Sequence, residues 1–276
     1  MQRKTALLCL MLGVVLSFAG SFSRPLLRGQ CAVYGHVSAG EAEAKEMNEV
    51  YGQARDTKKK KDADTQDKSA LLTNFEIIRQ MPELPTGCEI TALTMILNDY
   101  GFHVDKMTMA SEYLPKVPAD FYEGTDGRLY GPDMEAYFVG DPASGGYICG
   151  TGAIVSAAEA FLEERGSSLR AEDLTGTDAK DLYLLVDEGI PVLVWVTIGM
   201  EDRDQVQGWY TQAGEWMEWS RNDHGAVLIG CEKETVTIAD PLSGLRVYAR
   251  ERFEHVFASR GSQCVALLEE EFIPKK

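Results

Sequence analysis

Residues 83–101, ELPTGCEITALTMILNDYG, decide the fold because they predict a helix that begins at a cysteine. Apolar residues recur at helical spacing along this stretch, and Gly101 stands where a glycine commonly ends a helix. Thr86 and Glu89 have the T-x-x-E spacing of a capping box, in which both side chains bind backbone amides at the helix start. This pattern predicts Thr86 as the N-cap and places Cys88 in the first turn.

Two interpretations of Cys88 follow from this position. A thiol in the first turn meets unsatisfied N–H groups and partial positive charge, which should lower its pKa and favour the thiolate. The simpler interpretation is a small buried residue, because most free cysteines are buried. A catalytic role would also require a base elsewhere in the chain.

The segments after this helix predict a fold of the α+β class. Helices are expected at residues 104–114, 152–165 and 178–188, with a long loop region at 115–150. Strands are expected where β-branched and aromatic residues gather, at 191–198, 224–232, 235–240, 245–253 and 263–271. Helices that precede a run of antiparallel strands are typical of an α+β fold.

His224 is the strongest candidate for the base. It opens an apolar strand, and the small residue Gly225 beside it leaves the imidazole ring accessible. A hairpin around residues 233–234 would bring His224 to the same end of the sheet as Asp240, which could then orient the ring. The alternatives are a histidine at a sheet edge and an Asp-Pro turn initiator.

Gln80 is the candidate for stabilising an oxyanion. It lies eight residues before Cys88, and its side-chain amide could act together with the Cys88 backbone N–H. An ordinary polar loop residue is the alternative interpretation.

Two further segments are candidates for the walls of the same site. Residues 209–220, WYTQAGEWMEWS, carry four large aromatic side chains shortly before His224. They could line a substrate site or form a hairpin packed on the sheet. Residues 140–147, GDPASGGY, are expected at the rim of the cleft.

The N-terminus predicts export. Residues 1–21 combine a short basic start, an apolar run of about 15 residues and small residues suited to signal peptidase. The apolar run is shorter than the roughly 20 residues that span a bilayer, although an uncleaved anchor remains the alternative. We therefore expect a secreted or cell-surface protein whose only membrane contact would be that anchor.

Residues 22–72 predict a flexible charged linker. They include the run DTKKKKDADTQDKS at 56–69, which is nearly free of apolar residues. The folded domain is therefore expected to span residues 73–276.

The composition excludes some classes of function. The net charge of −16, from 43 acidic and 27 basic residues, argues against nucleic-acid binding, which requires a basic face. No CxxC pair or Cys/His cluster offers metal ligands, so neither a metal nor a cofactor is expected. Beyond Cys9 in the predicted signal peptide and Cys88, the sequence leaves open which cysteines pair: Cys31, Cys149, Cys231 and Cys264.

Several motifs together resemble one family. They are QMPELPTGCEITALTMILNDYGF, FVGDPASGG, GIPVLVWVT, NDHGAVLIGCEKETVTIADPLSG and GSQCVAL. In this order they resemble the papain-like cysteine peptidases related to the double-glycine leader peptidases that process bacteriocins, within the exported YvpB-like branch of Gram-positive bacteria. The resemblance covers residues 73–270.

The resemblance implies a papain-like α+β fold, with the nucleophile on an N-terminal helix packed against an antiparallel sheet. It implies Cys88 as nucleophile, His224 as base, Asp240 as the orienting carboxylate and Gln80 as the oxyanion donor. The family places this glutamine nearer the cysteine than it stands here. The chain also lacks the transporter domains of the leader peptidases, so cleavage after double glycine does not transfer.

Three functions are therefore in competition. The leading hypothesis is an exported cysteine peptidase that cleaves a peptide or protein through a thioester acyl-enzyme. An acyltransferase or a cell-wall amidase could use the same Cys-His-Asp triad. A non-catalytic surface binding module is the third alternative. The sequence specifies neither the substrate nor the oligomeric state.

Overall fold

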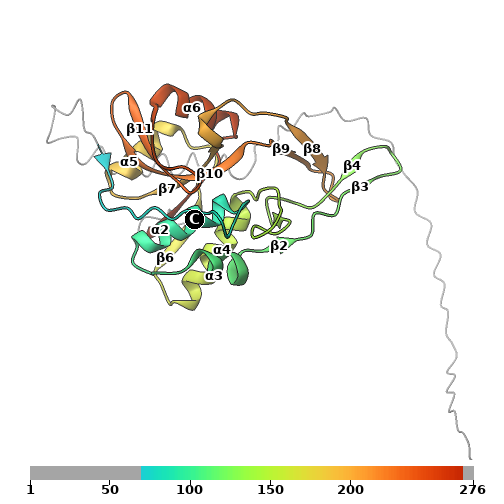
Figure 1. The fold of residues 1–276 in the computed structure, drawn as a ribbon, viewed down its shortest axis with the longest axis horizontal. Helices are drawn as coiled ribbons and strands as arrows, with labels where there is room; N and C mark the ends of the chain where they lie inside the picture. Colours follow the sequence, from blue (N-terminus) through green and yellow to red (C-terminus); the bar gives the residue numbers. More distant parts are fainter. Residues whose placement is uncertain (1–69, 270–276) are drawn as a thin grey trace, which may run out of the picture. The chain divides into compact units, whose positions relative to one another are not determined.

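The computed structural model describes residues 70–269, which are built around one antiparallel sheet (Figure 1). The strand order is β12-β11-β10-β7-β13-β6, and β1 pairs with the end of β10. The strands of this sheet are β1 (Ala70–Leu71), β6 (Leu169–Asp173), β7 (Val192–Thr197), β10 (Asp223–Cys231), β11 (Thr235–Asp240), β12 (Gly244–Ala249) and β13 (Cys264–Glu269). The α+β class expected from the sequence is confirmed.

The longer helices lie in two layers, one on each face of this sheet (Figure 1). They are α2 (Cys88–Asp99), α4 (Thr151–Glu164), α5 (Ala179–Asp187) and α6 (Arg250–Ser259). Alternate residues of β7 point to opposite faces: Leu193 and Trp195 pack with α2 and α4, whereas Val194 and Val196 pack with α5 and α6. Both faces of the central strands are therefore buried, which explains why these strands read as continuous apolar runs.

The helices expected near residues 88–100, 152–165 and 178–188 are present within a residue or two. Gly101 and Gly166 follow α2 and α4 with positive φ values of 88° and 62°, as expected for glycines that end helices. The helix expected at 104–114 is instead a short α3 (Lys106–Thr108) followed by the π-helical turn η1 (Met109–Tyr113).

One strand expected from the sequence is longer than the strand in the structure. Residues 245–253 were predicted as a strand, but β12 ends at Ala249 and α6 begins at Arg250. The reason is visible in the buried side chains, because Phe253, Val256 and Phe257 recur at helical spacing. Strand β6 was not predicted, since its sequence LRAED carries the polar residues that suit a strand at the sheet edge.

The region expected as a long loop contributes to two smaller sheets. Strands β2 (Lys116–Val117) and β5 (Phe138–Val139) pair in parallel. A four-stranded sheet has the order β3-β4-β8-β9 and lies beside the main sheet (Figure 1). Its strands are β3 (Tyr122–Glu123), β4 (Leu129–Tyr130), β8 (Gln207–Tyr210) and β9 (Trp216–Trp219). The remaining short element, η2 (Ile198–Met200), follows β7.

The aromatic segment at 209–220 is thus a hairpin in this second sheet. Trp209 is buried, and its indole N–H donates to the carbonyl of Pro132 at 2.7 Å. Trp216 is exposed. Trp209 and Met217 of this hairpin join the core cluster that includes Leu193 and Trp195 of β7, as expected for a packed hairpin, and the substrate wall stays a prediction.

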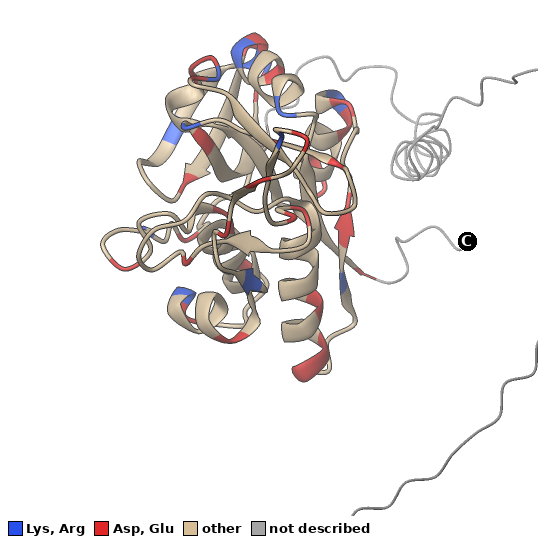
Figure 2. Ribbon diagram, turned by 90° about the vertical axis from the view of Figure 1, so that its right-hand side faces the viewer, with Lys and Arg blue, Asp and Glu red and all other residues tan. Residues whose placement is uncertain are grey.

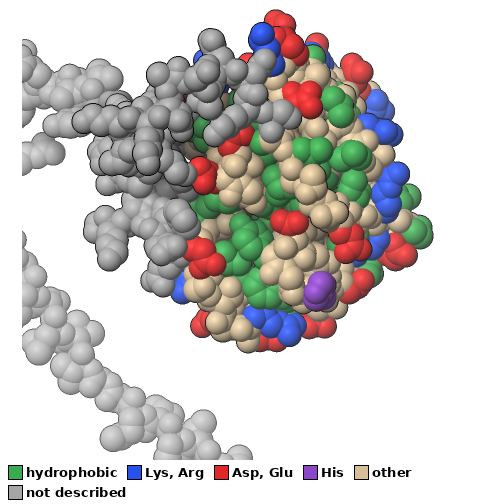
Figure 3. All heavy atoms as spheres, turned by 90° about the vertical axis from the view of Figure 1, so that its left-hand side faces the viewer, with side chains coloured by type: hydrophobic (Ala, Val, Ile, Leu, Met, Phe, Trp, Pro, Cys, Tyr) green, Lys and Arg blue, Asp and Glu red, His purple; other side chains and the backbone are tan. Residues whose placement is uncertain are grey.

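The charged residues that the structure describes do not gather into a basic face in either of two views (Figure 2 and Figure 3). Acidic residues are distributed over helices, strands and loops in the view of Figure 2. On the face shown in Figure 3, acidic, basic and hydrophobic side chains are interspersed. Within residues 70–269, none of the helices has the length and apolar character needed to cross a bilayer.

Candidate active site

Cys88 is the first residue of α2, but the predicted capping box is wrong. The N-cap is Gly87, with no side-chain cap, and the buried hydroxyl of Thr86 has no hydrogen-bond partner within the described residues. The Thr86 backbone N–H instead donates to the carbonyl of Pro142 at 3.3 Å, so the helix begins one residue later. Glu89 points into the interior, where its carboxylate accepts other hydrogen bonds.

Gly87 is required by its neighbours. A Cβ at this position would lie 2.9 Å from the Cβ of Leu84 and 3.1 Å from that of Pro142. Pro142 belongs to the loop at residues 140–147, so this loop packs against the start of α2. The expected location of that loop near the site agrees with the structure.

The predicted contact between His224 and Asp240 is present. The Nε2–H of His224 donates to Oδ1 of Asp240 at 3.0 Å, and both side chains are buried. The hairpin of β10 and β11 brings them together, with Val227 opposite Ala239 in the antiparallel register. Because Nε2 is engaged, Nδ1 is the ring nitrogen left to accept a proton.

Asp240 is held in its ionised form. Burial alone would raise its pKa, but the hydrogen bond and charge of His224 oppose this effect. The backbone amides of Leu242 and Ser243 also donate to Oδ1, at 2.7 and 2.9 Å. Together these interactions bring the pKa of Asp240 well below its ordinary value, so the carboxylate can orient the imidazole throughout the neutral range.

The start of α2 meets the start of β10 at Gly225, the residue after His224. A Cβ on Gly225 would lie 2.9 Å from both Cα and Cγ of Glu89, so only glycine permits this approach. The amide of Gly225 also faces the Cys88 sulfur and lowers its pKa. Cys88 and His224 therefore flank one helix–strand junction.

The expected activation of Cys88 by the helix start alone is not what the structure shows. Burial, followed by the negative charge of Glu89, raises the pKa of the Cys88 thiol well above its ordinary value. The thiol donates a hydrogen bond to Oε2 of Glu89 at 3.2 Å. These effects outweigh the helix start and the Gly225 amide, because only 8% of Cys88 is exposed.

Gln80 lies beside the same end of the sheet. Its backbone N–H donates to the carbonyl of Pro241 at 2.8 Å, directly after Asp240. Its side-chain Nε2 donates to the carbonyls of Leu84 and Pro85 at 3.2 and 3.1 Å, while Oε1 is buried without a partner within the described residues. The amide is therefore near the site with its donors directed at the 84–85 turn.

The sequence did not reveal a buried ion cluster behind His224. The side chain of Asp223 is fully buried, and its Oδ1 lies 3.3 Å from Arg203 Nε and 3.1 Å from Arg260 Nε. It also accepts the backbone N–H of Ser220 at 2.8 Å. This cluster fixes the first residue of β10, and only the adjacency of Asp223 to His224 could have hinted at it.

The remaining cysteines add no further chemistry to the site. Cys88, Cys149, Cys231 and Cys264 are buried and free, whereas Cys31 lies outside the described residues. Between residues 70 and 269, no group of three or more His, Cys, Asp or Glu side chains could hold a metal ion.

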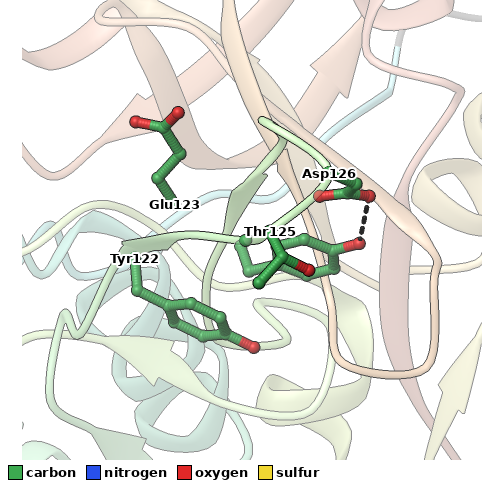
Figure 4. A pocket seen from close by; sticks show the side chains of 6 residues that line it. Tyr122, Glu123, Thr125 and Asp126 are labelled. Carbon is green, nitrogen blue, oxygen red and sulfur yellow. Dashed lines mark hydrogen bonds between the residues drawn. The ribbon is translucent and has the colours of Figure 1, made fainter.

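A surface pocket lies away from these residues, in the second sheet (Figure 4). It is lined by the turn between β3 and β4, and the Tyr130 hydroxyl donates to Oδ2 of Asp126 at 3.0 Å. None of the four predicted site residues lines this pocket.

Comparison with known proteins places the site in a family. The model of the Peptidase_C39 like family matches residues 72–265. YvpB of Bacillus subtilis (strain 168), a protein of uncharacterized function, is 31% identical over 188 residues, which are 67% of this chain and 70% of YvpB. A crystal structure of a presumed C39-like peptidase from Bacillus anthracis has a TM-score of 0.64 and 32% identity, covering 74% of this chain and 99% of that one. The chain therefore belongs to the Peptidase_C39-like family.

Proposed function

We propose that the protein is an exported cysteine peptidase in which Cys88, His224 and Asp240 act as a catalytic triad. The observation that supports this function best is the His224–Asp240 contact of 3.0 Å at the junction where Gly225 packs on the start of α2. In this proposal the nucleophile, the base and the orienting carboxylate work together across this helix–strand junction, which is the arrangement that acyl transfer requires. The family relationship supports the same reaction class.

The reaction proceeds through a thioester. The Cys88 thiol gives its proton to Nδ1 of His224, and the sulfur attacks the carbonyl carbon of the scissile peptide bond. The imidazolium then protonates the leaving amine as the C–N bond breaks. His224 next accepts a proton from water, whose oxygen attacks the thioester carbon and releases the acid product and the Cys88 thiol. Asp240 keeps the ring orientation throughout.

Two hydrogen-bond donors are proposed for the oxyanion, one from the backbone and one from a side chain. The Cys88 amide is in the first helical turn, where backbone N–H groups have no intrahelical acceptor. Gln80 is the second donor, and its amide must release one of the carbonyls of Leu84 and Pro85 to reach the substrate oxygen. Substrate binding would supply the alternative acceptor.

The test combines chemical labelling with peptide cleavage. Iodoacetamide should alkylate the wild-type protein selectively at Cys88, and the wild-type protein should cleave members of a peptide library. Mass spectrometry detects both reactions. His224→Ala should suppress both reactions, and Cys88→Ala should abolish cleavage. His255→Ala is the matched control, because this histidine is exposed on α6. Equal labelling and cleavage by the wild type and His224→Ala would contradict the proposed triad.

Export is part of the proposal and rests on residues 1–21. It is tested by sequencing the N-terminus of the protein recovered from the culture medium and from the cell surface. Recovery only from the cytosol, with residues 1–21 intact, would contradict it.

A further inference from the structure

Glu89 is a buried acid in direct contact with the proposed nucleophile. Only 1% of the residue is exposed, and its Oε2 accepts the hydrogen bond from Cys88 Sγ at 3.2 Å. Its Oε1 accepts the backbone N–H of Cys149 at 3.2 Å. Gly225 packs closely on the Cα and Cγ of Glu89, so the first part of this side chain is held at the junction of α2 and β10.

The surroundings of Glu89 do not fully compensate its charge. Within residues 70–269, no Lys or Arg side chain lies at ion-pair distance from it. The charged groups that interact electrostatically with Glu89 are His224 on β10 and Arg260 after α6. The neighbouring acids are Cys88, Cys149 and, further out, Glu135. Burial raises the pKa of Glu89, although its hydrogen bonds and His224 oppose this effect.

Cys88 and Glu89 are therefore two acids in contact in one buried site. Two such groups cannot easily ionise together, because each negative charge disfavours the other in a medium that water does not screen. One proton remains on the pair, either on the sulfur with the carboxylate ionised or on the carboxyl with the sulfur ionised. Only the second arrangement contains a nucleophile.

We infer that Glu89 is a catalytic residue whose carboxyl carries a proton whenever Cys88 acts as a thiolate, donating an O–H···S hydrogen bond to the sulfur. When the carboxyl ionises, its negative charge keeps the proton on the thiol, so Cys88 is not a nucleophile. In the reactive form the thiol proton resides on His224, and the proton on Glu89 comes from solvent. Glu89 thus makes and breaks no bond during acyl transfer; it controls how much thiolate exists.

This inference rests on the proposed function, since it assigns a partner to the nucleophile of that reaction. It differs from a structural role in one measurable property, which is the pH dependence of Cys88. A thiol paired only with histidine stays reactive as the pH rises. A thiol that also needs a protonated carboxyl loses reactivity when that carboxyl ionises.

The experiment measures the rate constant for alkylation of Cys88 by iodoacetamide, from the mass of the Cys88 peptide, between about pH 5 and pH 9. The wild-type rate constant should pass through a maximum and then fall as Glu89 ionises. Glu89→Gln keeps the shape and an N–H donor but cannot ionise, so it should remain reactive. On the alkaline side of the wild-type maximum it should react about ten-fold faster than the wild type.

Glu135→Gln is the matched control. Burial also raises the pKa of Glu135, but its Oε1 accepts from the Gln263 side chain at 3.1 Å instead of contacting the sulfur. Its profile should follow that of the wild type. Melting temperatures establish that each variant is folded, and the wild-type profile alone remains decisive if Glu89→Gln does not fold.

Each other outcome overturns the inference. A wild-type rate constant that rises steadily with pH, or an unchanged profile in Glu89→Gln, would leave Glu89 with a structural role. Slower alkylation of Glu89→Gln at every pH would make Glu89 the proton acceptor instead. If His224→Ala slows the reaction while Glu89→Gln changes nothing, the proposed function stands and this inference alone fails. A Cys88 that is inert in every folded variant, yet labels after unfolding, overturns both.

Discussion

The two buried carboxylates of the site, Asp240 at the end of β11 and Glu89 at the start of α2, have opposite electrostatic surroundings. Asp240 accepts hydrogen bonds from His224 and from two backbone amides, and its pKa lies below the ordinary value. Glu89 accepts from the Cys88 thiol and the Cys149 amide, and its own backbone amide also lowers its pKa, yet that pKa lies above the ordinary value. The same functional group is thus kept ionised at one end of the site and poised to hold a proton at the other.

The comparison teaches that the charge of the hydrogen-bond donors, and not burial alone, decides the role of a carboxylate. Burial is the largest single influence on both groups and raises the pKa of each. At Asp240 a histidine that can become positively charged reverses that influence. At Glu89 the principal partner is another acid, so burial prevails.

The largest effect is expected from Asp240→Asn, which removes the permanent charge. An asparagine can no longer stabilise the imidazolium, and it can hold the ring in the wrong tautomer. We expect kcat/KM for a cleaved peptide to fall by about 10³–10⁴-fold. Asp126→Asn is the control, because Asp126 also accepts a backbone amide, at 3.1 Å from Arg128, but in the exposed turn between β3 and β4. A loss below ten-fold would mean that the two carboxylates differ less in function than in environment.

The contact between His224 and Asp240 was predictable from the sequence because it depends on local hairpin geometry. A tight turn between two strands of alternating pattern fixes which residues meet at the open end of the hairpin. The buried position of the Glu89 carboxylate was not predictable from the sequence. The local T-x-x-E pattern is the same whether this carboxylate caps the helix or turns inward. What decides is the amide of Cys149, which lies 60 positions away in sequence.

The errors in the fold have the same origin. The helical spacing of Phe253, Val256 and Phe257 was hidden because it follows directly on the alternating pattern of β12. Strand β6 is recognisable only by its pairing with β13, since its own residues are largely polar. Local periodicity predicted the elements that carry the site, and long-range contacts decided the rest.

A smaller effect is expected from Gln80→Ala on the Asp240 side. If the amide leaves the carbonyls of Leu84 and Pro85 for the substrate oxygen, removing it should lower kcat by about 10²–10³-fold with little change in KM. Steady-state kinetics on a cleaved peptide measures both parameters. A rise in KM alone would show that Gln80 shapes the 84–85 turn without binding the oxyanion.

Gly225→Ala acts on the Glu89 side by pushing α2 away from β10. The added methyl would lie 2.9 Å from backbone and side-chain carbons of Glu89, so the helix must shift. We expect a loss of about 1–3 kcal/mol in the free energy of unfolding and slower alkylation of Cys88. Urea denaturation and the labelling assay measure these changes.

The control is Gly145→Ala, where an added Cβ meets no atom within 4 Å. It should leave both the free energy of unfolding and Cys88 alkylation close to the wild-type values. If Gly225→Ala also leaves the free energy of unfolding and Cys88 alkylation unchanged, the helix–strand junction tolerates displacement. The contact between Glu89 and the sulfur is then not fixed by packing.

The smallest effect, and the most direct test of the comparison, is the pH dependence of stability. The depressed pKa of Asp240 means that its contribution is fully present above its unfolded value, near 4, and is lost as the pH falls through the folded value. The raised pKa of Glu89 has the opposite sign, because the folded protein binds a proton more tightly than the unfolded chain. Acidification from neutral pH therefore stabilises the fold through Glu89.

The two carboxylates should consequently leave opposite signatures in urea denaturation measured across the acid range. The stability difference between wild type and Asp240→Asn should shrink below about pH 4, whereas that between wild type and Glu89→Gln should change between about pH 4 and neutrality, in favour of the wild type as protons are added. For Asp240 the change should amount to about 1–3 kcal/mol. Differences of the same sign and pH range for both variants would contradict the opposed environments from which their roles are inferred.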